Sequence, residues 1–309
     1  MQDQPLRFEQ IHIDVARNST DDFNPFHDPM RWRNIRRNPF GSTIALGFQM
    51  AFLASDRIQR YREQQGEAAH IRGQGLHFSN YEFLFAGALQ AGEEFTLEVK
   101  KTVDTNAGNG GVSNRSAIRR FGGELILLGT QSETRTPRFL DQAVLQGLPS
   151  LQHLPDRAKV PGTPFFLKRK FLNTSNAKNF TLGALCDQFQ YFDELSERIC
   201  FPPLFTTALL SCALLEKGWS EGYDFEADPL VYTSHQISVD RRIQRQLRSN
   251  DVLHLLIEGP LPLPAHKGLG RSAVEQQSYH CYGLLHGNQV LLRGQLQLAP
   301  LHAFLAAEI

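Results

Sequence analysis

The sequence has few of the features that mark secreted, metal-binding or membrane proteins. Its four cysteines all lie in the second half without CxxC spacing, which argues against a disulfide framework and a thiolate metal site. The eleven histidines show no HxH or HExxH spacing, so no metal is expected. No apolar run approaches the roughly 18 residues that a membrane helix needs. We therefore expect a cytoplasmic protein with reduced thiols that neither crosses nor binds a membrane.

The sequence also lacks an excess of charge of either sign. Lys plus Arg and Asp plus Glu both number 32, so the formal net charge is zero. This balance argues against nucleic acid or an acidic membrane surface as the main partner. No GxSxG elbow is present, which argues against a serine hydrolase. What the chain does have is 41% hydrophobic residues over 309 positions, enough for one large core or two medium ones.

A weak internal repeat is the main clue to the fold. Residues 75–100 align with residues 232–259, so that His77 matches His235 and Leu89 matches Leu247 at an offset of 158. Upstream of each copy, at 43–61 and 204–218, apolar and small residues recur at helical spacing. The alternating stretches predict strands at 75–86, 93–103, 112–121 and 124–136, and again at 233–246, 251–259, 271–287 and 289–299.

These elements predict an α+β fold made of two similar halves. Each half would contain an opening strand, a loop, a buried central helix and then several antiparallel strands. The predicted domains are 1–137 and 165–309, and the four prolines of 138–164 indicate a linker. The alternative is two unrelated α+β domains whose spacing coincides by chance.

The loop STDDFNPFHDP, residues 19–29, holds the candidate catalytic side chains. Asn24 is a favourable N-cap and Pro25 suits a first helical position, so a short helix should begin here with His27 in its first turn. The positive end of a helix disfavours an imidazolium, so we expect His27 to be neutral. Asp22 lies just outside the turn, where it could bind the same water. Alternatively, the loop is an ordinary capped turn in which Asp22 bonds backbone amides.

This block resembles the hydratase motif of the MaoC-like family, the (R)-specific enoyl-CoA hydratases and dehydratases with a hotdog fold. The matching residues are Asp22, Asn24, Pro25, Phe26 and His27, followed by FGSTIALG at 40–47. The resemblance covers residues 7–136 and extends to 165–299 through the repeat, as in double-hotdog members of the family. The chain departs from the family pattern in two places: Asp28-Pro29 follows His27 at once, and Leu46 stands where a histidine is common.

The resemblance implies addition of water to a trans-2-enoyl thioester, giving an (R)-3-hydroxyacyl thioester, or the reverse dehydration. Asp22 would act as general base toward the water, and His27 would hold the water and share the proton returned to C2. The backbone N–H of Gly47 would polarise the thioester oxygen, although helix–sheet packing explains this glycine equally well. Asn24 would shape the loop. No cofactor is implied beyond the coenzyme A or phosphopantetheine of the substrate.

The second half lacks the candidate pair. No histidine occurs between His153 and His235, and Asp187 and Asp193, in the corresponding slot at 179–198, have no histidine nearby in sequence. We therefore expect this half to be a non-catalytic partner that completes a pseudo-dimer and the wall of an acyl tunnel. The pseudo-dimer could pair again as a homodimer.

The segment RWRNIRRNPF, residues 31–40, carries arginines beside the candidate loop. Arg31, Arg33, Arg36 and Arg37 are candidates for contacts with the phosphates of coenzyme A or with an acidic acyl carrier protein; a solvated helix face is the alternative. Two other functions stay open: a non-catalytic protein that binds acyl thioesters, and a hotdog thioesterase. The latter is disfavoured because residues 43–55 contain no Asp or Glu.

Overall fold

The structure, a computed structural model, describes residues 5–104, 111–263 and 276–306. Its first half contains β1 (Leu6–Arg7), α1 (Gln10–Thr20), α2 (Gly47–Gln64), α3 (Glu67–Gly73), β2 (Phe78–Phe85), β3 (Glu94–Val99), β4 (Val103–Asp104), β5 (Gly111–Arg120) and β6 (Leu125–Thr134). Its second half contains β7 (Ala158–Lys159), β8 (Phe166–Phe171), α4 (Thr174–Gly183), β9 (Phe192–Asp193), β10 (Arg198–Ile199), α5 (Pro203–Ser220), β11 (Leu230–Asp240), α6 (Arg241–Gln244), β12 (Val252–Pro262), β13 (Gln277–Leu284), β14 (Val290–Pro300) and α7 (Leu301–Ala306). The predicted central helices are confirmed, and each predicted strand overlaps an observed one. Residues 241–244 of the strand expected at 233–246 form helix α6 instead, and residues 271–275 of the strand expected at 271–287 lie outside the described part.

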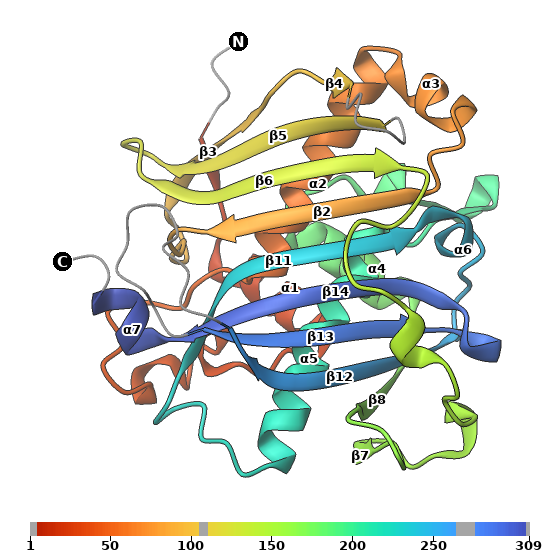
Figure 1. The fold of residues 1–309 in the computed structure, drawn as a ribbon. Coiled ribbons are helices and arrows are strands. Elements are labelled where there is room, and N and C mark those ends of the chain that lie inside the picture. The colour runs from red at the N-terminus through yellow and green to blue at the C-terminus, as the bar shows by residue number, and fades with distance from the viewer. Residues whose placement is uncertain (1–4, 105–110, 264–275, 307–309) are drawn as a thin grey trace.

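One large antiparallel sheet joins the two halves. Its strand order is β1-β3-β5-β6-β2-β11-β14-β13-β12-β8-β7, with β4 beside β5. Strands β2 and β11 are neighbours at its centre, and the long helices α2, α4 and α5 lie behind it in Figure 1. Because one strand of each half forms the central pair, neither half has a free sheet edge there.

The pairing of β2 with β11 supports the internal repeat. Asn80 lies opposite Ser238, and the Ser238 hydroxyl donates a hydrogen bond to Asn80 Oδ1 at 2.7 Å. These two residues are separated by 158 positions, the offset at which the two copies align. A residue that pairs with its own counterpart marks a local two-fold axis, so the halves are related by a pseudo-two-fold axis through the middle of the sheet.

The element before the candidate loop is a helix, whereas the sequence predicts an opening strand there. The alternating Ile11, Ile13 and Val15 suggest a strand. In α1, however, the buried residues include Ile13, Ala16 and Thr20, at helical spacing. The prediction was wrong for this segment because, of the three alternating residues, only Ile13 is buried, whereas Ile11 is exposed.

Helices α1 and α4 pack closely enough to require a glycine between them. A Cβ added at Gly183 would lie 2.8 Å from the carbonyl oxygen of His12 and 3.0 Å from Ala16 Cβ. On its other side α4 contributes Phe180, whose ring stacks on Phe52 of α2 with centroids 5.6 Å apart. The same phenylalanine lies 5.9 Å from Phe205 of α5. The two halves therefore share one hydrophobic core behind the sheet.

Residues 138–164, for which the sequence predicts a linker, run from the end of β6 across the front of the sheet to β7 (Figure 1). Leu151 and Val160 are buried in a separate small core with Leu256 and Tyr282 of the second half. The hydroxyl of Tyr282 donates to the carbonyl oxygen of Asp141 at 3.0 Å. This segment therefore covers part of the face of the sheet that lies opposite the helices.

Candidate active site

Asp22 is placed by the way in which α1 ends. The backbone of Asp21 is left-handed, with φ of 54°. The N–H of Asp22 donates to the carbonyl of Arg17 at 2.9 Å, and that of Asp21 to Asn18 at 3.4 Å. This Schellman arrangement satisfies the last helix carbonyls and reverses the chain. As a result Asp22 points inward directly after the turn and is buried.

The predicted capped turn is confirmed. Asn24 Oδ1 accepts a hydrogen bond from the N–H of Phe26 at 3.1 Å, and Pro25–His27 forms a single 3-10 turn. Asn24 thus shapes the loop, as the sequence suggests. One oxygen of Asp22, Oδ1, accepts a hydrogen bond from the N–H of Asn24 at 2.9 Å. This bond is the one expected if the loop is an ordinary capped turn. The other oxygen makes a contact that the sequence does not predict.

His27 is buried, and its hydrogen bond fixes its tautomer. Nδ1 lies 2.8 Å from the carbonyl oxygen of Ile44. A carbonyl only accepts, so Nδ1 carries the proton and Nε2 of the neutral ring is an acceptor. Burial is the main cause that lowers the pKa of His27, and the Arg17 charge acts in the same direction. The carboxylate of Asp22 and the Ile44 carbonyl oppose this shift, which shows that the two candidate groups act on each other.

Ser211 and Tyr232, both from the second half, complete the surroundings of Asp22. Ser211 Oγ donates to Asp22 Oδ2 at 2.7 Å, and the hydroxyl of Tyr232 donates to Ser211 Oγ at 3.2 Å. Sequence reasoning missed both residues as part of the site. The one signal that pointed to Ser211 was a polar residue on the otherwise apolar stripe of the helix predicted at 204–218.

Gly47 lies at the start of α2 beside a small cavity that His27 also lines. This cavity, about 60 Å³, is called the reaction cavity below. The first N–H groups of a helix have no intrahelical acceptor, so the N–H of Gly47 is available to an oxygen in this space. A Cβ at Gly47 would also lie 3.2 Å from the ring of Phe85. Both explanations of this glycine are therefore compatible with the geometry.

A larger cavity, called the deep chamber below, lies next to the reaction cavity. It measures about 270 Å³, and Ser211 is part of its lining. Asn24, Leu230 and Tyr232 line both spaces. Asp22 itself lines neither cavity, but its carboxylate is hydrogen-bonded to Asn24, which lines both, and to Ser211, which lines the deep chamber.

The four arginines that follow the loop do not act as one group. Arg31 forms an ion pair with Glu226 at 3.1 Å, and the guanidinium of Arg33 lies over the ring of Trp32. Arg36 and Arg37 instead line a further cavity of about 270 Å³. That cavity reaches Pro229, which directly precedes Leu230, the first of the three β11 residues that border the reaction cavity. Only Arg36 and Arg37 therefore lie near a path to the site.

The corresponding position in the second half holds a cysteine. Leu185 is left-handed and the N–H of Cys186 donates to the carbonyl of Thr181 at 3.0 Å, as Asp22 does at the end of α1. Burial raises the pKa of the Cys186 thiol. This supports a half without an acid–base pair.

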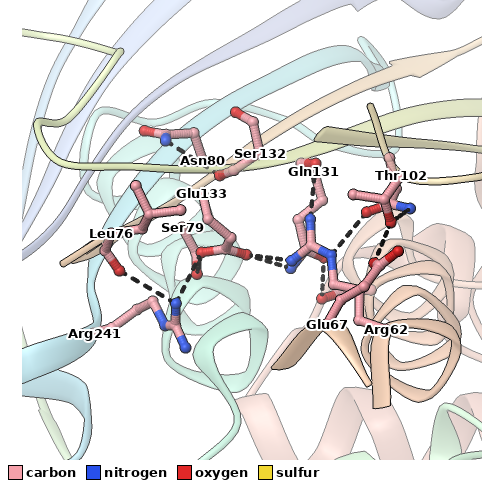
Figure 2. A network of polar contacts seen from close by, with 12 residues as sticks. Arg62, Glu67, Leu76, Ser79, Asn80, Thr102, Gln131, Ser132, Glu133 and Arg241 are labelled. Atoms are coloured by element: carbon pink, nitrogen blue, oxygen red, sulfur yellow. Dashed lines mark hydrogen bonds and ion pairs between the residues drawn. The ribbon is translucent and has the colours of Figure 1, made fainter. Parts of the chain in front are cut away.

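A cavity of about 200 Å³, lined by residues of both halves, has buried charges in its wall. Figure 2 shows Glu133 between the guanidinium groups of Arg62 and Arg241, with N–O distances of 2.7 and 3.4 Å. Burial alone would raise the pKa of Glu133, but the two arginines lower it overall. An apolar chain in this cavity would cover charged groups at high cost, so this cavity is unsuited to an apolar ligand.

His235 is fully buried among aromatic rings next to the site. Its ring stacks on Phe48 at 4.3 Å and meets Tyr232 edge-on at 4.5 Å. Neither ring nitrogen has a hydrogen-bond partner among the described residues. Burial therefore lowers the pKa of His235 to about 3.

Replacing His235 with leucine is expected to stabilise the protein, most clearly in mild acid. The folded protein resists protonation of this ring, while the unfolded chain binds the proton below pH 6.5. The free energy of unfolding should therefore fall from pH 6.5 toward pH 3, at up to about 1.4 kcal/mol per pH unit from this group. Urea unfolding of parent and His235→Leu across this range measures the difference. The exposed His153→Gln is the control, and equal slopes for all three proteins would contradict the prediction.

Comparison with solved structures finds the same architecture over almost the whole chain. A structure named MaoC-like dehydratase matches with a TM-score of 0.59 and 11% identity over 96% of each chain. RV0216, a conserved hypothetical protein from Mycobacterium tuberculosis described as having a double hotdog fold, gives 0.57 at 12% identity, over 96% of this chain and 94% of its own. A Chloroflexus aurantiacus structure described as a MaoC domain protein dehydratase gives 0.56 at 10% identity, over 96% and 93%.

These matches confirm the predicted double-hotdog fold, and they include the MaoC-like dehydratases that the loop motif resembles. No protein-family model and no curated protein matches the sequence. Of the helices in the described ranges, none is long and apolar enough to cross a membrane. The same residues contain no group of three or more His, Cys, Asp or Glu side chains that could hold a metal ion.

Proposed function

We propose that the protein interconverts trans-2-enoyl thioesters and (R)-3-hydroxyacyl thioesters by adding or removing water. The observation that carries this proposal is the neutral His27, whose Nε2 is an acceptor and whose pKa is influenced by the Asp22 carboxylate, at a cavity that also reaches the N-terminus of α2. The MaoC-like dehydratases among the structural matches support the same class of reaction.

In the hydration direction each group has a defined task. Asp22 accepts a proton from the water as the water oxygen bonds to C3 of the enoyl group. His27 Nε2 accepts the other hydrogen of this water in a hydrogen bond and so orients it. The electron pair of the double bond moves toward the carbonyl, and the N–H of Gly47 stabilises the charge on the thioester oxygen. The proton is then returned to C2 by the Asp22–His27 pair.

The carrier of the acyl group would approach along the start of β11. The cavity of Arg36 and Arg37 borders Pro229, and the reaction cavity and the deep chamber both border Leu230 and Tyr232. We propose Arg36 and Arg37 as contacts for the phosphates of coenzyme A or of a carrier-protein phosphopantetheine. The reaction as written needs no separate cofactor.

The purified protein is expected to consume crotonyl-CoA with loss of the conjugated enoyl absorbance, and chiral analysis should find the (R) product. His27→Gln should lower kcat by roughly 10²-fold, since the amide can still hold water but cannot share its proton. His70→Gln, on α3, is the control. Binding of butyryl-CoA without turnover of any enoyl-CoA or enoyl carrier protein would instead indicate a protein that only binds acyl thioesters.

A further inference from the structure

Tyr232 borders both the reaction cavity and the deep chamber, as do Asn24 and Leu230. The reaction cavity, at about 60 Å³, is far smaller than the roughly 300–1,000 Å³ of a typical ligand pocket. An acyl group longer than a few carbons that reacts beside His27 would therefore have to extend past Tyr232.

Tyr232 is held in place by contacts on several sides. Its ring meets His235 edge-on at 4.5 Å and Phe48 at 5.9 Å between centroids. It also lies against Phe85, with centroids 6.4 Å apart. The hydroxyl donates to Ser211, which in turn bonds Asp22. Moving the ring aside would break this hydrogen bond and disturb a packed aromatic cluster, so the ring acts as a fixed partition.

The deep chamber has an apolar side that is suited to an aliphatic chain, although its lining also includes Lys217 and Glu221, which pair with each other. Leu214 and Leu215 of α5, with Leu298 of β14, form much of its apolar lining. Access to this space would lengthen the part of the substrate that can be buried. Each buried methylene contributes to binding in proportion to its area. The partition therefore controls whether the methylenes of a longer acyl chain can be buried in the chamber and add to binding.

We propose that Tyr232 restricts this protein to short acyl chains by separating the reaction cavity from the deep chamber. The inference rests on the proposed function, because that function places the reacting thioester in the reaction cavity. It adds a specificity-determining residue, supplied by the second half of the chain, to a site whose acid and base come from the first.

The test compares Tyr232→Ala, which opens the partition, with Tyr232→Phe, which keeps the ring and loses the hydroxyl. The ratio of kcat/KM for dodecenoyl-CoA to that for crotonyl-CoA should rise at least tenfold in Tyr232→Ala. Tyr232→Phe should keep the parent ratio but lower kcat/KM equally for both substrates. The reason is that Ser211, which bonds Asp22, loses the hydrogen bond from the Tyr232 hydroxyl. The double variant Tyr232→Ala/Leu214→Trp, which refills the chamber, should lose the gain.

Binding of saturated acyl-CoA, measured by isothermal titration, separates this inference from the proposed reaction. Suppose that neither parent nor variant consumes any enoyl-CoA, but that the affinity for dodecanoyl-CoA relative to butyryl-CoA is at least tenfold higher in Tyr232→Ala than in the parent. The partition is then supported and the hydratase proposal is refuted. If the folded Tyr232→Ala keeps the parent chain-length ratios in turnover and in binding, the partition is refuted. Should the alanine variant not fold, Tyr232→Leu is measured against the same criteria.

Discussion

Replacing Asp22 with asparagine is expected to lower kcat for enoyl-thioester hydration by about 10²- to 10⁴-fold, the usual contribution of a positioned general base. The amide has nearly the same shape as the carboxylate but cannot take a proton from water. Because Asp22 holds no part of the substrate in the proposed mechanism, KM should change much less than kcat. Steady-state kinetics with crotonyl-CoA measures both parameters.

The neighbouring acid provides a matched control for this experiment. Asp21 has the left-handed backbone at the end of α1, which asparagine also tolerates, and its exposed carboxylate pairs with Lys170. Asp21→Asn should therefore keep parent kinetics. Thermal unfolding of both variants checks that the loop remains folded. An Asp22→Asn protein with parent kcat would remove Asp22 from the mechanism and leave His27 as the only base.

Replacing Glu133 with alanine is expected to cost about 3–5 kcal/mol in the free energy of unfolding, as for a buried ion pair that loses one partner. Glu133 Oε1 accepts hydrogen bonds from Arg62 at 2.7 Å and from Gln131 at 2.9 Å. Ser79 donates to Oε2 at 2.6 Å (Figure 2). Without the carboxylate, the 4% exposed Arg62 would be a buried charge without its counter-ion.

Two further variants distinguish the loss of the ion pair from a general sensitivity of the sheet. Glu98→Gln removes an exposed pair with Lys100 and should change stability by less than about 1 kcal/mol. The double variant Arg62→Met/Glu133→Leu removes the buried pair and leaves only Arg241, whose side chain is partly exposed. It should recover most of the loss. Denaturant unfolding measures all of them. A Glu133→Ala protein as stable as Glu98→Gln would show that the buried charge is compensated in another way.

The sequence by itself determined the local features of this protein. Apolar residues that recur every two positions located the strands, and those that recur every three to four positions located the central helices. These spacings are readable because the apolar side of each element faces the core. The turn at Asn24-Pro25 could be predicted because an N-cap residue and a proline affect only the backbone of neighbouring residues. The constant offset between the copies further predicted two similar halves, and the register of Asn80 with Ser238 agrees with it.

Only the tertiary structure decided what surrounds the candidate pair. Helix α1 was missed because its buried residues are chosen by contact with α4, which no local pattern encodes. Ser211 and Tyr232 lie some 190 and 210 positions from Asp22 and meet it only because β2 and β11 join the halves. His27 is neutral mainly through burial, not through the helix end invoked from its sequence position. Burial and contacts between distant segments depend on the whole fold, so they cannot be predicted from local sequence spacing.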